Sequence, residues 1–593
     1  MIGGLLRGLA GVVTGAAPEG EPSIRARPRG LPWVHSTVHV TRDRWRNWAG
    51  TLEARPARIY SDHAGGGHRS PRTLADLQAI VREARAQGVG VRVFGSSHSW
   101  SSLVPCDGFL VDNRMIGASG DRYVTRVEPA GPGRKPRVTV PPGITLREFE
   151  RWLWDAGFSL PAATVADCFT VGGLVAVASH GAGLDLPSLS DAVVGVTFVD
   201  GLGEVRRWAR ETATADELAA ARCSLGALGL VYDVTLEVEP RYEVLFEARA
   251  VPYRELFADT DEARARLRRL HEEHLSIQVF WGPFGYSGAR FVSKPAINPD
   301  VWLITATKAI PEGARARTPL QRWTHLSLID VPSMFLNGHL MRALTAIPAL
   351  TGYIPVTQAG TEVWVEARSG AWRMPTYDAN HYLNAVGVGF VRATACEWSI
   401  PFRPGAPDGA RDGYERVRAS FAALHDLVVD AFHAHPLSDP RSGPVTMCVE
   451  LRTMAPGRAL LDPQRLPDGA DPATRFAVPE LVTSVGHPAW PAFVREAHRA
   501  LTGDPARFGD VLQHLAKEWR DLPHPRHPGG TAAWIRDRYK AAGTWQRFLA
   551  VRERVDPDGV FLNDFLRAWF EVPAGRAARS APTRDDAVAR DAG

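Results

Sequence analysis

One stretch in the last third of the chain holds an acid and a base at a spacing that could do chemistry. The segment "VTMCVELRTMAP" at 445–456 alternates as a strand does, which places Glu450 and Arg452 on one face with Cys448 as their neighbour. A carboxylate accepts hydrogen bonds and a guanidinium donates them, so the pair could hold a polar ligand. The alternative is a simple salt bridge or a solvated pair.

A second charged stretch lies further along, in "LQHLAKEW" at 512–519. His514 and Lys517 stand three positions apart, on one face of the segment if it is helical. A lysine directed into a site could stabilise negative charge that develops during a reaction. The alternative is a lysine on the surface of a helix.

A histidine occupies a loop of small residues in "VRVFGSSHSW" at 91–100. The first four residues alternate as a strand, and a glycine, serines and His98 follow. A second glycine-rich segment, "TVGGLVAVASHGAG", lies at 170–183. Backbone N–H groups in small-residue loops can approach an anion closely, so we expect two loops, each leaving a strand, to sandwich one diphosphate. A tight turn between buried strands is the alternative for the second segment.

Neither loop has the G-x-G-x-x-G pattern that opens a helix in dinucleotide-binding folds. A Rossmann-bound NAD or FAD is therefore disfavoured.

Several helices and turns that would position these residues are well signalled. Thr73 and Thr145 are predicted N-caps, each with an acidic residue three positions later, and begin helices within 70–88 and 144–157. Asp200-Gly201 predicts a hairpin turn. A C-terminal helix is expected to stop at Asp556.

The composition is that of a globular protein with several domains. The chain has 593 residues, 45% hydrophobic and 23% charged, with a net charge of +4. No basic stripe with interleaved aromatic residues indicates a nucleic-acid partner. The odd number of scattered cysteines, 5 in all, without a C-x-x-C pair, argues against a disulfide framework or a zinc site, and we expect no metal.

The N-terminal segment "MIGGLLRGLAGVVTGAAPEGE" is too short to span a bilayer and lacks a charged stretch before its apolar part. We expect a soluble, cytoplasmic protein without an integral membrane segment. Export, or association with a membrane surface through the N-terminus, is the alternative. The sequence does not indicate an oligomeric state.

The chain divides into five predicted regions. Residues 1–39 are a poorly ordered extension, 40–240 an α+β domain, 241–510 an aromatic-rich second domain or cap, 511–572 a C-terminal segment, and 573–593 a disordered tail.

Four motifs in this order resemble a known family: "RVFGSSHSWSSLVPCDGFLVDN", "TVGGLVAVASHGAG", "SLGALGLVYDVTLEVEP" and "DPDGVFLNDFL". They are similar to the flavin domain of the vanillyl-alcohol oxidase, or PCMH-type FAD-binding, superfamily, and most of all to the aldonolactone and alditol oxidases. The resemblance covers about 45–240 and 445–570. It implies an α+β fold: a PCMH-type FAD-binding domain of two subdomains, a cap domain with an antiparallel sheet, and a C-terminal segment that returns to the flavin domain.

The resemblance also implies FAD as the cofactor, bound covalently through His98 to the 8α-methyl of the flavin. Cys168, in "CFTVGG", matches a cysteine that forms a second link in the berberine bridge enzyme group; the alternative is a small buried thiol. The implied cofactor-binding residues are Gly95, Ser96, Ser97, His98, Ser99, Trp100, Cys168, Thr170, Val171, Gly172, Gly173, Ala178, Ser179, His180, Gly181, Ala182, Gly183 and Val231.

On the substrate side, the resemblance implies catalytic roles for Glu450, Arg452, Lys517 and His514. Where the family has Trp-Gly between the last two, this chain has Leu-Ala, which puts the local backbone in question. We expect an oxidase of a CH–OH group in a sugar-derived alcohol or aldonolactone, with hydride transfer to flavin N5 and dioxygen as acceptor.

Three alternatives stay open. The aromatic-rich middle domain could bind a larger lipophilic or natural-product alcohol, as in covalent-flavin sterol oxidases. The enzyme could be a dehydrogenase with another electron acceptor. A flavin-binding protein without turnover is the third, although a binder needs no charged cluster.

Overall fold

The computed structural model describes residues 23–25, 39–65, 67–120, 122–161, 163–286, 295–317, 369–382, 392–405, 413–436 and 439–573. These residues form helices and largely antiparallel sheets, so the expected α+β class is confirmed. Within the described residues, no helix is both long enough and apolar enough to cross a membrane.

The N-terminal extension is partly ordered. Strand β1 (Ser23–Arg25) pairs antiparallel with β9 (Arg122–Val124), which also pairs with β8 (Ala118–Ser119). Residues 23–25 of the predicted extension thus form a strand of this sheet. The remainder of that prediction, up to residue 38, lies outside the described residues, as does the tail prediction for 574–593.

The first layer is a parallel sheet of β5 (Arg58–Tyr60), β7 (Phe109–Asp112) and β6 (Val91–Phe94). Helix α2 (Leu74–Gln87) feeds β6 and buries Leu77 and Val81 in the cluster that also contains Val91. Its N-cap Thr73 and Asp76 form the predicted capping box, an arrangement worth about 1 kcal/mol.

A second sheet of five antiparallel strands follows. Its order is β10 (Arg126–Glu128), β11 (Arg137–Val140), β15 (Leu230–Glu237), β13 (Val193–Val199) and β14 (Val205–Ala209). The hairpin from β13 to β14 turns at Asp200-Gly201, as predicted. Helix α3 (Leu146–Asp155) starts at the predicted Thr145–Glu148 capping box. Helices α4 (Val171–Ala176) and α5 (Ala215–Arg222) complete this part.

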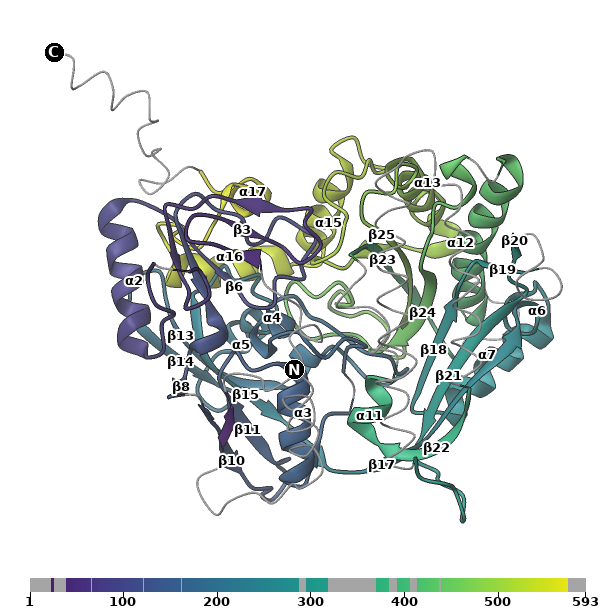
Figure 1. The fold of residues 1–593 in the computed structure, drawn as a ribbon, viewed down its shortest axis with the longest axis horizontal. Helices are drawn as coiled ribbons and strands as arrows, with labels where there is room; N and C mark the ends of the chain where they lie inside the picture. Colours follow the sequence, from purple (N-terminus) through teal and green to yellow (C-terminus); the bar gives the residue numbers. More distant parts are fainter. Residues whose placement is uncertain are drawn as a thin grey trace, which may run out of the picture.

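The C-terminal helices α15 (Gly530–Ala541), α16 (Thr544–Val555) and α17 (Asp564–Trp569) return to the first part of the chain, where Figure 1 shows α16 and α17 in yellow beside the purple N-terminal strands. The Val91 amide donates to the Val560 carbonyl over 2.8 Å, and Arg547 forms an ion pair with Asp216 of α5 at 2.6 Å. Contacts between distant parts of the chain thus join β6 to the end of the protein.

The third sheet has 8 antiparallel strands in the order β22 (Gly370–Pro375), β17 (Glu243–Pro252), β21 (Asp300–Thr307), β18 (Ser276–Trp281), β24 (Cys448–Met454), β25 (Arg475–Ser484), β23 (Ala393–Phe402) and β26 (Leu512–Gln513). Figure 1 shows it in teal and green on the side of the molecule away from α2.

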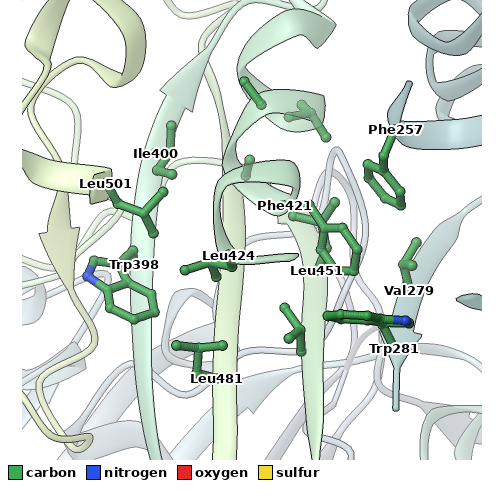
Figure 2. Packing of buried hydrophobic residues seen from close by; sticks show 14 of the residues in the cluster. Phe257, Val279, Trp281, Trp398, Ile400, Phe421, Leu424, Leu451, Leu481 and Leu501 are labelled. Atoms are coloured by element: carbon green, nitrogen blue, oxygen red, sulfur yellow. The ribbon is translucent and has the colours of Figure 1, made fainter. Parts of the chain in front are cut away.

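Helix α12 (Tyr414–Ala434) covers one face of this sheet (Figure 2). Trp398, Leu451 and Leu481, from three adjacent strands, pack in one buried cluster with Phe421 and Leu424 of the helix. Successive strand residues point to opposite faces, so the neighbours of these residues in sequence lie on the other face. That second face carries the candidate site.

Shorter elements complete the fold: β2 (His39–Val40), β3 (Trp45–Arg46), β4 (Glu53–Ala54), β12 (Phe158–Ser159), β16 (Glu239–Pro240), β19 (Phe284–Tyr286), β20 (Pro295–Ile297), α6 (Tyr253–Phe257), α7 (Asp261–Glu273), α11 (Thr376–Asn380), α13 (Trp490–Thr502) and α14 (Pro505–Phe508). Three single 3-10 turns are η1 (Asn113–Met115), η2 (Leu189–Ala192) and η6 (Pro440–Ser442).

Candidate active site

The loop that leaves β6 packs directly against the segment before α4. A methyl group built on Gly95 would overlap Thr170 Oγ1 and lie 3.0 Å from Asn113 Oδ1, so this close approach requires glycine. Ser96 Oγ donates a hydrogen bond to the Cys168 carbonyl over 2.6 Å. The two small-residue segments singled out in the sequence therefore lie in contact.

Each of these segments also holds a non-glycine residue in the left-handed region. Ser97 has φ 59° and Ala178 has φ 53°. Such a conformation costs about 1–3 kcal/mol and persists only where the surroundings fix it. Trp45 Nε1 contributes by donating to Ser97 Oγ over 3.0 Å. Strain of this kind concentrates at ligand-binding sites.

His98 lies between two aromatic rings. Its ring stacks on Trp48 with centroids 4.7 Å apart and an interplanar angle of 17°, and Phe169 meets it edge-on at 4.7 Å. Its Nε2 lies 3.8 Å from Cys168 Sγ. Burial lowers the pKa of His98 to about 3, so the imidazole is neutral and keeps a nucleophilic nitrogen lone pair.

The second glycine-rich segment differs from the prediction. It does not leave a strand through a turn, because its first half is helix α4, with Thr170 at the N-cap. Gly172 lies so close to Pro142 that an added methyl would be 2.6 Å from its Cβ, and a methyl on Gly181 would overlap the Ala163 carbonyl. The glycines are therefore needed for close packing of the backbone, a constraint that spacing alone does not reveal.

Both segments are hydrogen-bonded to the large sheet or to the turn after β26. The Trp100 amide donates to the Ala516 carbonyl over 2.8 Å, and its Nε1 donates to the Ala393 carbonyl over 2.7 Å. The Gly183 amide donates to the Thr453 carbonyl of β24 over 2.8 Å. These bonds place the His98 loop beside the strands that carry the charged residues.

On the face of the large sheet opposite α12, three glutamates stand in a row on adjacent strands. Glu450 of β24 pairs directly with Glu480 of β25, which pairs with Glu397 of β23. Directly opposed like charges destabilise a sheet unless cations intervene. Arg452 supplies one cation: its Nη2 donates to Glu450 over 2.7 Å and also contacts Glu480. Glu450 and Arg452 therefore share one face of β24, as predicted, and form the salt bridge that was the alternative to a ligand-binding pair.

Lys517 supplies the second cation. Its Nζ lies 2.7 Å from Glu397 Oε2 and also contacts Glu480 Oε1. The helical interpretation of this segment is wrong, because residues 514–518 form a turn after β26, with the Lys517 amide bonded to the His514 carbonyl. Burial alone would lower the pKa of Lys517, but the two carboxylates more than offset this and raise it. The lysine is therefore a fixed ammonium and not a solvated surface group.

The two histidines predicted for the site approach Glu397. His180 Nε2 lies 2.9 Å from Glu397 Oε1, so this side chain faces the carboxylate. His514 Nδ1 accepts the Ala516 amide over 3.2 Å, and burial lowers the pKa of His514 to about 3. Ligand atoms of His180, Glu397 and His514 lie within 4.8 Å of one another, a spacing that could suit a metal ion. The Lys517 ammonium on the same carboxylate opposes a second cation, so we assign the trio to the ion-pair network.

Glu397 and Glu480 were missed by sequence reasoning. Each is a single glutamate inside an otherwise apolar strand, in "ACEWSIPF" and "FAVPELVTS". Their exposed fractions are 1% and 4%, and glutamate is almost never fully buried unless it is paired. An isolated glutamate in an apolar strand was therefore the available signal.

The residues of the two segments fit a bound nucleotide cofactor. Thr170 Oγ1 and Asn113 Oδ1 are buried beside Gly95 without a hydrogen-bond partner in the protein, and Arg452 Nε is likewise buried and unsatisfied. Buried polar atoms without partners are rare, and a ligand is one of the standard ways to satisfy them.

Several groups of the two segments predicted to bind the diphosphate are already hydrogen-bonded within the protein. The backbone N–H groups of Val171, Gly172, Ser179 and Gly183 donate to protein carbonyls. Ser99 Oγ contacts the Ala516 carbonyl over 3.2 Å. These residues therefore shape the segment, and a bound anion would be contacted by others.

Val231, also predicted to bind the cofactor, lies on β15. Its side chain packs against two hydrophobic clusters. A contact with a ligand there would come from the backbone.

Residues 68–209 match the family model described as an FAD binding domain. L-gulono-1,4-lactone dehydrogenase of Mycobacterium tuberculosis is 26% identical over 532 residues, which is 88% of this chain and 98% of that protein. D-arabinono-1,4-lactone oxidase of Eremothecium gossypii is 32% identical over 201 residues, which is 34% of this chain and 35% of that protein. These matches agree with the resemblance to the PCMH-type FAD-binding superfamily that the sequence motifs indicated.

The fold of this chain is shared with solved cholesterol oxidases. One from B. sterolicum superposes with a TM-score of 0.68 at 17% identity, covering 94% of this chain and 100% of that chain. A solvent-stable cholesterol oxidase gives a TM-score of 0.67 at 19% identity, over 92% of this chain and 100% of that chain. At these identities the likeness shows the fold of the chain.

Proposed function

We propose that this protein is an FAD-dependent oxidase of a CH–OH group in an aldonolactone or a related sugar alcohol. The observation that carries the proposal is the row of paired charges on β23, β24 and β25, which lies beside the small-residue loop that holds His98. The sequence relatives named as lactone oxidases and a lactone dehydrogenase support the same substrate class.

The bound FAD supplies a two-electron oxidant that accepts hydride from the substrate carbinol carbon. The loop 95–100 and the segment 168–183 would hold its diphosphate. Arg452 retains an unsatisfied Nε–H and Glu450 retains carboxylate lone pairs, which suits a substrate with several hydroxyl groups. Lys517 would hold the substrate oxygen while negative charge develops on it.

We place the covalent link to the flavin 8α-methyl at His98. Its neutral ring is held by Trp48 and Phe169, so a ring nitrogen can act as a nucleophile without a strong base. Such a link would replace a C–H bond of the 8α-methyl and the N–H of the His98 ring, and it would release two electrons that the flavin itself could accept. Flavin should remain with the acid-precipitated polypeptide; a colourless pellet from a yellow protein would contradict the link.

Cys168 is the candidate for a second link. Its thiol lies next to His98 and is buried, with an exposed fraction of 6%. The mass of the flavin-bearing peptides decides the matter, because Cys168→Ala removes one cross-linked peptide only if the thiol is attached. An unchanged pattern in the variant assigns Cys168 as a buried thiol.

The decisive experiment for the proposed function is anaerobic reduction of the purified yellow protein. L-gulono-1,4-lactone, D-arabinono-1,4-lactone, alditols and lipophilic alcohols are mixed with it in turn, and air is then admitted. We expect a lactone or alditol to bleach the flavin, and air to restore it with release of hydrogen peroxide.

Each other result has a definite meaning. Bleaching by lipophilic alcohols alone would assign a different substrate class. A bleached protein that stays bleached in air would indicate a dehydrogenase with another acceptor. No bleaching by any compound would indicate a flavin-binding protein without turnover.

A further inference from the structure

The central glutamate of the three-strand row has an environment that the outer two lack. Glu480 is flanked by Glu450 on one side and by Glu397 on the other, each directly opposite in register. One of its carboxylate oxygens contacts Lys517 Nζ and the other contacts Arg452 Nη2. Glu480 thus links the two cations of the site.

The charges of this cluster form an alternating series. In order, the series is His180, Glu397, Lys517, Glu480, Arg452 and Glu450, each in contact with the next. His180 Nδ1 lies 3.0 Å from the Gly181 carbonyl and its Nε2 lies 2.9 Å from Glu397 Oε1, so both ring nitrogens face oxygen atoms. Three carboxylates thus share the cations of Lys517 and Arg452, and a cluster with more carboxylates than such cations can take up one proton at modest electrostatic cost.

The pKa values of Glu397 and Glu480 are shifted in opposite directions. Burial raises the pKa of Glu397, but Lys517 and His180 more than offset this and hold it well below its usual range. Burial raises the pKa of Glu480 to about 7. Lys517 and Arg452 lower this pKa, but the carboxylates of Glu450 and Glu397 raise it again. Of Glu397 and Glu480, it is Glu480 whose pKa lies near neutral pH.

Among the described residues, the charged or titratable groups of this cluster besides Glu480 lie on three elements and in the segment after α4. They are Cys396 and Glu397 on β23, Cys448, Glu450 and Arg452 on β24, His514 and Lys517 in the turn after β26, and His180. Burial raises the pKa of both thiols well above the usual range and lowers that of His514 to about 3, so these three groups stay neutral near pH 7.

Lys517 is the more exposed member of its ion pair with Glu480. The side chain of Glu480 has an exposed fraction of 6%, whereas that of Lys517 has 14%. Because Lys517 Nζ contacts Glu480 Oε1, a proton released at the ammonium can pass directly to the glutamate. Lys517 is therefore the member of the pair better placed to touch substrate.

We propose that Glu480 is the proton acceptor of the site, receiving the hydroxyl proton of the substrate by way of Lys517. The inference rests on the proposed function. Lys517 gives a proton from Nζ to Glu480, and the amine takes the proton of the substrate hydroxyl. The carbinol C–H bond breaks with its electron pair passing to the flavin, the oxidant, and the C=O bond forms. One proton has moved to Glu480 and Lys517 is again an ammonium.

The test compares Glu480→Gln with Glu397→Gln in the flavin-loaded protein. Both variants remove a carboxylate from Lys517, but only the first removes the acceptor. The rate of anaerobic flavin reduction by L-gulono-1,4-lactone is followed from about pH 5 to about pH 9. In the wild type the rate of flavin reduction should rise with pH, with its midpoint near pH 7; this rise is the limb of the pH profile.

We expect Glu480→Gln to lose this limb and to reduce the flavin on the order of 10²-fold more slowly at high pH. Glu397→Gln should keep the limb even if its rate falls. Bleaching of the wild type with an unchanged limb in Glu480→Gln would overturn the assignment of Glu480 alone. Absence of bleaching in the wild type would overturn the proposed function and the inference with it.

Infrared difference spectra provide a readout that does not need turnover. As the pH falls through about 7, the carbonyl stretch of a protonated acid should grow in the wild type and be smaller in Glu480→Gln. Asp462, whose pKa is raised to about 7 by burial, titrates in both proteins and serves as the internal reference. Identical spectra would contradict the proposal. If the glutamine variant does not fold, Glu480→Asp must move the limb to a different pH, and an unmoved limb would overturn it.

Discussion

The two faces of the eight-stranded sheet are built from the same strands, but one face is apolar and the other carries charged residues. On one face Trp398, Leu451 and Leu481 pack under α12 (Figure 2), and on the other Glu397, Glu450 and Glu480 form a row of paired charges. Adjacent residues of one strand therefore serve either the core or the site. Because successive residues of a strand point to opposite faces, the packed core on one face fixes the positions of the charged side chains on the other. Ion pairing alone would not hold these charged side chains in place.

The largest expected effect tests whether the charged face depends on a cofactor beside it. Gly95→Ala forces a methyl group onto Thr170 Oγ1, which separates the two small-residue segments, so we expect loss of bound flavin and of all activity. Gly282→Ala is the matched control, because a methyl group there meets nothing within 4 Å. Flavin absorbance per polypeptide measures the outcome, and equal loading of the two variants would contradict the contact.

A substitution on the charged face should lower turnover without lowering the stability of the fold. Glu450→Gln keeps the shape of the side chain but removes the charge that Arg452 and the substrate share. We expect turnover to fall on the order of 10²-fold with flavin content and Tm nearly unchanged. Steady-state kinetics at matched flavin content checks this, and full activity would show that the site lies elsewhere.

The neighbouring residue on the other face should behave in the opposite way. Leu451→Ala removes a side chain that is 3% exposed and packs in the cluster beneath α12. The free energy of unfolding should fall by about 2–5 kcal/mol, while the folded fraction keeps its rate per flavin. Denaturant unfolding and kinetics on one preparation test both halves. A large loss of rate per flavin would show that the two faces are not independent.

A buried pair outside the row should affect stability alone, and by the smallest amount. His381 Nδ1 lies 3.1 Å from the Val165 carbonyl and its Nε2 contacts Glu150 of α3, which joins α11 to the FAD-binding part. Burial lowers the pKa of His381, but Glu150 more than offsets this and raises it to about 9.

Because the folded pKa of His381 exceeds the unfolded value, the stabilisation is complete below about pH 6.5 and is lost as the pH rises through 9. His381→Gln should therefore lower Tm at pH 6 by a few degrees and have little effect above about pH 9. A difference in Tm that does not depend on pH would contradict this linkage.

Local patterns in the sequence correctly predicted the starts of two helices and the strand face shared by Glu450 and Arg452. The capping boxes at Thr73 and Thr145 and the alternation that pairs Glu450 with Arg452 each depend on residues a few positions apart. Such patterns are read correctly because the interactions that produce them are themselves local.

The rest of the site depends on contacts that spacing does not encode. Glu397 and Glu480 become neighbours only through the order of strands in the sheet, in which β25 lies between β24 and β23. The sequence left open a lysine on the surface of a helix, whereas Lys517 lies in a turn that is held by the pairing of β26 with β23 and by the bond from Trp100 to Ala516. Helix α4 replaces an expected turn because Gly172 packs against Pro142.

The central claim is that the charged face of the sheet oxidises the substrate at a flavin held beside it. Its most direct test is the absorbance of the flavin after anaerobic mixing with L-gulono-1,4-lactone, in the wild type and in Arg452→Ala at equal flavin content. We predict that the wild type is bleached and that the variant, without the guanidinium that joins Glu450 to Glu480, is bleached on the order of 10²-fold more slowly. Equal rates in the two proteins would contradict the claim.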